Sequence, residues 1–542
     1  MAEGTQQASD MWQYRPGEVV VAVHLPDDPA QHPPAHGRVA EAIQQQLAGS
    51  TGGVVGPSHQ QPEPIVFRAP GRPPLGFLFY DLEQQTHQPV KEVVNGLHRN
   101  GGADLATSLE RVGISPVGVM PHWLASCQPW HQDGSPASVP GPARPPGEGR
   151  WRYRYTARQA DLNTRARAAE LPDSAQVPVL VLDTAPRWSH ARQQAERFAA
   201  SNAALAEVFE RLSEHPLQEW HRQAARQMRD DGLALAPSPD GREQNYDMSD
   251  HGLFVAGLIH DLAPHADLRL RPVLNPRGVG NLHLLLRVLA DEVAGKDPRA
   301  PLAINMSLGF GPKLEHLAWM WYGVSRPNDP DFWPDAPTAG AADAHDRPWL
   351  AGQRDEVSRT LYQLHSGVDH LMRYLLANNC LGIAAAGNDS RRRAETGEPR
   401  FGPRLPARYE SVLGVAATRG EPDQAASYSN AGDELEYGDH IATFGGEVDA
   451  SNQPHPGAIG VYTAATYPGG QDNTTGWAAW SGTSFATAIA AGVVAGYWAE
   501  QREADPGTSA ESILLRFNQL AGSYAPALRT PSFAVDGAWE RA

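Results

Sequence analysis

The feature that most constrains this chain is a short turn that places a serine at the start of a long apolar helix. Gly482-Thr483-Ser484 precedes the apolar run Ala488–Tyr497. Gly482 lets the backbone bend sharply, and Ser484 then sits where unpaired helix N–H groups and the positive dipole end favour a developing anion. An ordinary helix N-cap is the alternative, because serine and threonine fill that position widely. Taken alone, the segment favours the cap.

Two other segments change that balance. Val177–Thr184 has the pattern of a buried strand and ends on a carboxylate, Asp183. Ser249–Gly257 is typical of a turn that opens a helix, with His251 in the first turn. An acyl-transfer triad needs a serine that attacks, a histidine that carries its proton and an aspartate that orients the imidazole. Each residue has an ordinary structural alternative, but the three together favour a triad with Ser484.

A fourth segment supplies a donor for a developing negative charge. Leu381–Asp389 is an apolar strand that runs into a small-residue turn and exposes the amide of Asn388. A side-chain N–H beside the backbone N–H of Ser484 makes an oxyanion hole. A plain strand-to-turn junction is the alternative, since Gly-Asn is also favourable turn chemistry. The accompanying motifs favour the oxyanion hole.

The order Asp183, His251, Asn388, Ser484, with its local motifs, resembles the subtilisin family of serine proteases, which shares this acid, base and nucleophile order. The resemblance covers roughly Val177 to Tyr497 and implies a three-layer α/β/α domain with a parallel sheet that acts as a serine endopeptidase. By the same resemblance, two segments and the turn before Asn388 bind substrate: Gly278, Val279, Gly280, Ser307, Leu308, Gly309, Ala386 and Gly387. The usual glycine after Asp-Thr is Ala185 here, a departure from the family pattern two residues after Asp183.

Composition fits a large enzyme. The chain has 542 residues, 41% of them hydrophobic, and a net charge of −17, which argues against nucleic acid as a partner. The sequence shows no signal peptide and no membrane-spanning segment, so we expect a cytoplasmic protein without a membrane partner. Cys127 and Cys380, far apart, predict neither a disulfide framework nor a zinc site. No cofactor is required, and the sequence leaves calcium binding open.

Residues 1–127 predict a small α+β domain. Strand and helix patterns alternate as β-α-β-β-α-β from Glu18–Leu25 to Val117–Met120, which is the ferredoxin-like order. Subtilisin-type prodomains share this order, and the resemblance implies that Val117–Trp123 is an inhibitory tail in the active site. A permanent accessory domain is the alternative. Residues 128–150 are a Pro/Gly-rich linker, and residues 151–542 form the catalytic domain.

Two insertions enlarge the catalytic domain, at about 188–245 and 313–375. Either they pack small cores of their own, or they form a lid or a partner-sensing surface. With a prodomain-like segment, they motivate a second hypothesis, a dedicated processing protease that a protein partner or a cleavage activates on a peptide or protein substrate. A peptide-binding pseudoprotease is the third, although all four active-site residues are present.

Overall fold

We describe a computed structural model of the chain, which divides into two compact units. The first unit comprises Met1–Leu124, Leu286–Lys296 and Gly311–Leu371, and the second comprises Ala125–Leu285, Asp297–Phe310 and Met372–Ala542. The structure describes residues 14–46, 54–58, 61–82, 90, 93–94, 103–111, 113–127, 137–157, 175–213, 247–311, 348–431, 440–451, 453–520 and 523–542.

A parallel sheet forms the centre of the second unit. Its order is β9 (Leu268–Pro272), β8 (Val179–Asp183), β11 (Leu302–Met306), β13 (Cys380–Ala385), β14 (Val412–Thr418) and β15 (His440–Phe444). Beyond β15 lie β19 (Thr530–Ser532), which is parallel, and β18 (Ser523–Ala525), which is antiparallel to β19. Every residue of β8, β11, β13 and β14 is buried, as expected for parallel strands covered on both faces.

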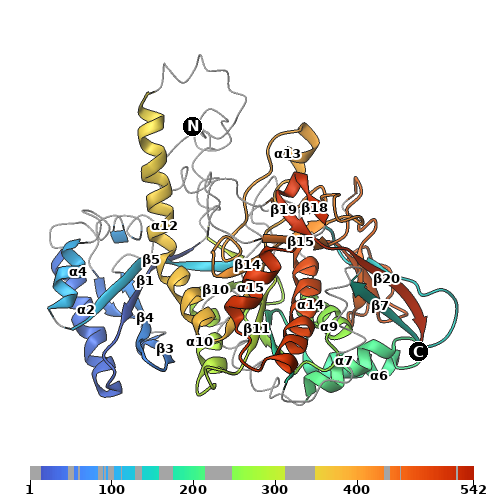
Figure 1. The fold of residues 1–542 in the computed structure, drawn as a ribbon, viewed down its shortest axis with the longest axis horizontal. Coiled ribbons are helices and arrows are strands. Elements are labelled where there is room, and N and C mark those ends of the chain that lie inside the picture. The colour runs from blue at the N-terminus through green and yellow to red at the C-terminus, as the bar shows by residue number, and fades with distance from the viewer. Residues whose placement is uncertain are drawn as a thin grey trace. The chain divides into compact units, whose positions relative to one another are not determined.

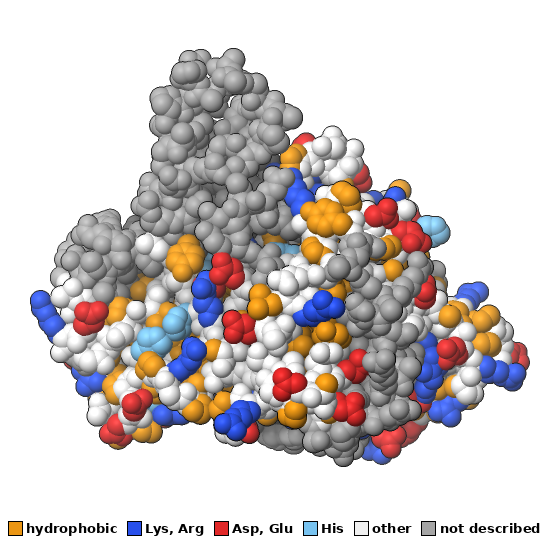
Figure 2. Space-filling view, in the orientation of Figure 1, with side chains coloured by type: hydrophobic (Ala, Val, Ile, Leu, Met, Phe, Trp, Pro, Cys, Tyr) orange, Lys and Arg blue, Asp and Glu red, His pale blue; other side chains and the backbone are white. Residues whose placement is uncertain are grey.

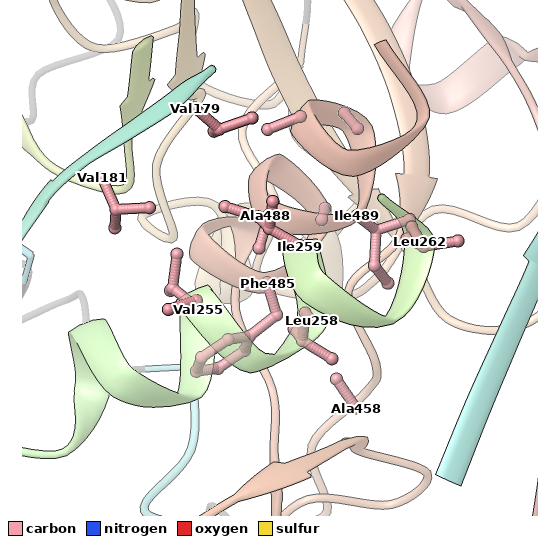
Figure 3. Packing of buried hydrophobic residues seen from close by; sticks show 14 of the residues in the cluster. Val179, Val181, Val255, Leu258, Ile259, Leu262, Ala458, Phe485, Ala488 and Ile489 are labelled. Atoms are coloured by element: carbon pink, nitrogen blue, oxygen red, sulfur yellow. The ribbon is translucent and has the colours of Figure 1, made fainter. Parts of the chain in front are cut away.

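Two helices that pack on this sheet and on each other carry the predicted histidine and serine. They are α9 (His251–Leu262) and α14 (Thr483–Ala504), which lie side by side in Figure 1. Figure 3 shows Val255 and Ile259 of α9 packing against Phe485 and Ala488 of α14. Every residue of α14 from 483 to 499 is buried, because its many alanines and glycines allow close approach on all sides. The predicted parallel-sheet α/β fold is therefore confirmed.

Smaller elements complete the second unit. They are β6 (Gly141–Pro142), β7 (Trp151–Ala157), α6 (Trp188–Phe198), α7 (Ala203–Ser213), β10 (Val279–Asn281), β12 (Gly309–Phe310), α13 (Arg391–Thr396), β16 (Ala458–Val461), β17 (Trp477–Trp480), α15 (Ala510–Asn518), η7 (Pro526–Leu528) and β20 (Val535–Arg541). Within the stretch predicted to be a linker, β6 pairs with β17, and the Ser138 hydroxyl accepts a hydrogen bond from the Ser481 N–H at 2.8 Å. This stretch thus contacts the turn before the serine.

An antiparallel sheet forms the first unit. Strand β1 (Tyr14–His24) lies between β4 (Arg72–Leu82) and β5 (Ser115–Ser126), and both β2 (Val54–Pro57) and β3 (Ile65–Ala69) pair with β4. The helices are η1 (Pro29–Gln31), α2 (His32–Gln46) and α4 (Ala103–Glu110). The strand predicted at Val117–Met120 lies within β5, where Met120 pairs with Val20, and the whole of Val117–Trp123, which the resemblance makes an inhibitory tail, belongs to this strand. The second helix of the predicted β-α-β-β-α-β order, expected at residues 90–97, lies largely outside the described residues.

Helices α10 (Leu282–Val293) and α12 (Pro348–Ala377) contribute to both units. Within the first unit α12 packs on β5, where the Trp123 indole N–H donates to the Leu364 carbonyl at 3.1 Å and its ring stacks on His365 at 4.8 Å. A Cβ on Gly367 would lie 2.1 Å from Met120 Cε, so glycine permits this approach. The insertion predicted near 313–375 therefore supplies a helix to the first unit. Residues 214–246 and 312–347 of the two insertions lie outside the described residues.

On the described part of the face in view, the distribution of side chains does not indicate a particular binding partner. Figure 2 shows acidic and basic side chains interspersed with apolar ones over the described part of the face in view. Among the helices that the structure describes, none is both long and apolar enough to cross a membrane.

Candidate active site

The predicted acid and base meet where a strand ends and a helix begins. Asp183 is the last residue of β8 and His251 the first residue of α9. His251 Nδ1 donates to Asp183 Oδ1 at 2.7 Å, and both side chains are buried. Such a bond fixes the ring orientation and the tautomer that a general base needs. The structure thus brings these two residues together as the sequence predicted.

Thr184 and Gly252 hold this junction closed. The Thr184 hydroxyl donates to the Met248 carbonyl at 2.7 Å and accepts from the Gly252 N–H at 3.1 Å. A Cβ on Gly252 would lie 2.1 Å from the Thr184 carbonyl oxygen, so only glycine permits the helix to start this close to the strand. The backbone near Asp183 is therefore well ordered even though Ala185 replaces the usual glycine.

Asp250, which sequence reasoning did not single out, fixes the start of α9 from the other side. Its carboxylate accepts hydrogen bonds from the Thr463 N–H, the Thr463 hydroxyl and the Ala464 N–H, each at 2.6 Å. Burial raises the pKa of Asp250, and these hydrogen bonds oppose that rise. An acidic residue directly before the histidine was the available signal, but its partners lie 213 residues further along the chain.

The predicted nucleophile lies in the first turn of α14. The Ser484 hydroxyl donates to the Ser307 carbonyl at 3.3 Å, and the Ser307 hydroxyl donates to the Ser484 carbonyl at 2.9 Å. The His251 ring centre is 5.4 Å from that of Phe485, the next residue of α14. The imidazole thus lies against the turn that carries Ser484, although the serine hydroxyl is bonded to Ser307 in this structure. Catalytic hydrogen bonds are often long or misaligned before substrate binds.

Asn388 is held with its amide donor available. Its Oδ1 accepts from the N–H and the hydroxyl of Thr483, each at 2.9 Å, which leaves the Nδ2 group outside these bonds. The Ser484 N–H belongs to the first turn of α14, whose donors have no partner within the helix. Asp389 stiffens the turn, because Arg404 donates to both of its carboxylate oxygens at 2.8 and 2.7 Å. Two donors therefore stand close to the serine.

The end of β5 occupies the groove that was predicted to bind substrate. Ser126 pairs with Gly309 and Ala125 with Phe310 in an antiparallel ladder. On the other side the Cys127 N–H donates to the Gly278 carbonyl at 3.0 Å. Gly278 and Gly309 thus hold an extended segment of this chain between them.

The other residues predicted to bind substrate surround this segment. Val279 and Gly280 belong to β10, where a Cβ on Gly280 would lie 2.1 Å from the Val273 carbonyl oxygen. Leu308 is buried, and so is Ala386 at the end of β13. Gly387 follows with a φ of +107°, and its N–H donates to the Thr483 hydroxyl at 3.2 Å.

Cys127 lies at the centre of the site. Its Sγ and single ligand atoms of Asp183 and His251 all lie within 4.8 Å of one another. Burial raises the pKa of the Cys127 thiol, and the negative charge of Asp183 adds to that rise. Both cysteines are free, and the sequence did not indicate that Cys127 lies near Asp183 and His251. No local motif announces it, because it depends on where β5 ends.

A family model described as the subtilase family matches residues 175–516, well over half of the chain. The chain belongs to the subtilase family. It is a serine endopeptidase of subtilisin type, and its substrates are peptides or proteins. No curated protein matches it.

Several solved structures are similar to the chain. The protease domain of PatA, in mutant form, is 20% identical, covers 66% of this chain and 91% of its own, and has a TM-score of 0.35. A lanthipeptide protease is 19% identical, with coverage of 69% and 93% and a TM-score of 0.36. The epidermin leader peptide processing serine protease of Staphylococcus aureus, also a mutant, is 12% identical, with coverage of 95% and 97% and a TM-score of 0.42.

Proposed function

We propose that this subtilase cleaves peptide bonds with a triad of Ser484, His251 and Asp183, and that Asn388 completes its oxyanion hole. The buried 2.7 Å bond between His251 Nδ1 and Asp183 Oδ1 is the observation that carries the proposal. It leaves Nε2 as the nitrogen that can accept a proton. The ring lies against the turn that bears Ser484, which is the arrangement a general base requires.

The steps follow from this arrangement. The Ser484 oxygen attacks the carbonyl carbon of the substrate while His251 Nε2 takes its proton, and Asp183 stabilises the imidazolium that forms. The negative charge on the former carbonyl oxygen is stabilised by Asn388 Nδ2 and the Ser484 N–H. The imidazolium then gives its proton to the leaving amine, and water repeats the sequence on the acyl-enzyme.

We also propose that residues 125–127 hold the enzyme inactive by occupying its groove. Ala125 and Ser126 pair with β12, and Cys127 bonds to Gly278, so a substrate strand would have to displace all three. The preceding segment supports a ferredoxin-like regulatory domain, because β5, β1, β4 and β3 follow one another across its sheet. The domain then acts as an inhibitor in cis, and a partner or a cleavage that frees residues 125–127 activates the enzyme.

Two probes test the catalytic triad and its inhibition by residues 125–127 separately. A fluorophosphonate labels an activated serine without needing the whole groove, whereas fluorescent casein needs the groove free. Cys127→Pro removes the N–H that bonds to Gly278, a contact of about 1 kcal/mol, while Cys127→Ala keeps it. We expect labelling of the parent at Ser484, none in Ser484→Ala, and casein hydrolysis at least about fivefold faster in Cys127→Pro than in Cys127→Ala.

The catalytic triad and the inhibitory role of residues 125–127 can be overturned independently. Absence of labelling in the parent and in Cys127→Pro would overturn the triad. Labelling with equal casein hydrolysis in the parent and both variants would leave the triad standing and overturn the inhibitory role of residues 125–127.

A further inference from the structure

Three side chains of the types that bind zinc converge in the occupied groove. Cys127 Sγ, one carboxylate oxygen of Asp183 and one imidazole nitrogen of His251 lie within 4.8 Å of one another. Asp183 and His251 are buried and come from the end of β8 and the start of α9, so their backbones are fixed by secondary structure. Cys127 is held by its hydrogen bond to Gly278. The three ligands are thus positioned by rigid neighbours.

One oxygen atom of this cluster lacks a hydrogen-bond partner among the described residues. Asp183 Oδ1 accepts from His251 Nδ1 and from the Thr184 N–H at 2.6 Å, but Asp183 Oδ2 is buried and has no hydrogen-bond partner among the residues that the structure describes. A buried carboxylate oxygen without a hydrogen-bond partner destabilises the folded protein. A cation bound at Oδ2 would remove that destabilisation.

The chemical types of the three ligands determine which metal ion they favour. Thiolate, imidazole and carboxylate are the ligands of zinc, at about 2.3, 2.0 and 2.1 Å. Tetrahedral geometry at these lengths places the ligand atoms roughly 3.3–3.8 Å apart, a spacing compatible with atoms that lie within 4.8 Å of one another. Calcium and magnesium prefer sets made of oxygen and gain nothing from the thiol.

We propose that Cys127, Asp183 and His251 form a zinc-binding site that exists only while residues 125–127 occupy the groove. The thiol proton is released to solvent. The neutral imidazole binds through Nδ1, the nitrogen that faces Asp183, and its proton moves from Nδ1 to Nε2. Three protein ligands leave one tetrahedral position for water.

The effect on activity rests on the proposed function. With zinc on Nδ1 the ring proton is on Nε2, so the imidazole cannot accept the serine proton and the general base is lost. The bond to Cys127 also fastens residues 125–127 in the groove. Zinc therefore stabilises the inactive form, and loss of zinc, or its capture by another ligand, favours release.

Cobalt(II) provides a readout that does not depend on catalysis. The full chain with Ser484→Ala, which prevents self-cleavage, is titrated with cobalt(II), and the thiolate-to-cobalt absorption band is followed. We expect one cobalt per chain with that band, and displacement of cobalt by zinc. Cys127→Ser in the same background is expected to lose the band and to weaken zinc binding more than roughly 100-fold, since it removes a direct ligand. Cys380→Ser is the matched control, because Cys380 lies in β13 and is expected to leave the band unchanged.

A second experiment tests whether zinc binding inhibits the enzyme. Zinc is expected to slow fluorophosphonate labelling of the parent at least about tenfold at concentrations of about ten times its Kd or more, and to have no such effect on Cys127→Ala. Circular dichroism of each variant verifies folding, and His251→Gln in the Ser484→Ala background is a second route to removing a ligand if a Cys127 variant does not fold.

The outcomes are distinct. No thiolate band, or a band that Cys380→Ser abolishes and Cys127→Ser retains, would overturn the zinc site. Equal slowing by zinc in the parent and in Cys127→Ala would also overturn it. A cobalt band in the Ser484→Ala chain, together with no labelling of the metal-free parent or of Cys127→Pro, would uphold the zinc site and overturn the protease mechanism.

Discussion

Replacing Gly252 by alanine should separate the aspartate from the histidine. A Cβ at this position would lie 2.1 Å from the Thr184 carbonyl oxygen and 2.9 Å from Asp183 Cβ, whereas real Cβ contacts essentially never fall below 3.0 Å. The start of α9 must therefore retreat by roughly 1 Å, and a misplacement of that size can cost about 100-fold in rate. The 2.7 Å bond between His251 and Asp183 would lengthen beyond hydrogen-bonding distance. We expect the labelling rate to fall at least about 100-fold.

Gly257→Ala is the matched control on the same helix. Its Cβ would meet Val461 Cγ2 at 2.8 Å, the end of a side chain that can rotate, and not backbone. Overpacking costs about 1–3 kcal/mol in such cases, so this variant should lose stability but keep most of its labelling rate. Second-order rate constants for fluorophosphonate labelling and thermal unfolding are measured for both variants and the parent. A Gly252→Ala enzyme that labels within about threefold of the parent would refute the reasoning.

Three further changes test other parts of the site. Asn388→Ala should lower kcat with little change in KM; the loss for such a change in a subtilisin is about 10²–10³, a figure we adopt, and steady-state peptide hydrolysis measures it. Asp250→Ala should lower the free energy of unfolding by about 2–4 kcal/mol in urea titration, because the buried donors of Thr463 lose their acceptor. Burial raises the pKa of Asp261 to about 7, above its unfolded value of 3.8. Protonation of Asp261 therefore stabilises the folded state, and this stabilisation is complete below pH 3.8 and is lost as the pH rises through 7. Asp261→Asn should therefore stabilise the protein by a few kcal/mol at pH 8 and hardly at pH 4, as thermal unfolding at the two pH values would reveal.

The sequence predicted most of what is local. The strand that ends on Asp183 and the helix that begins at His251 lie as expected, because buried parallel strands and helix starts have strong local patterns. It did not predict that Trp123 belongs to a sheet strand, or that Cys127 reaches the histidine. Those depend on how far β5 extends before it meets Gly278, a pairing between residues 151 positions apart. Short-range patterns carry no information on such distant register.

The burial of α14 has a consequence for how this enzyme fails on heating. Every residue from 483 to 499 is buried, so the segment bearing the serine contacts solvent only when most of the second unit opens. Amide hydrogens in such segments exchange with free energies close to that of global unfolding. Inactivation by heat should thus follow complete unfolding of the second unit, without an earlier stage in which the nucleophile alone is lost.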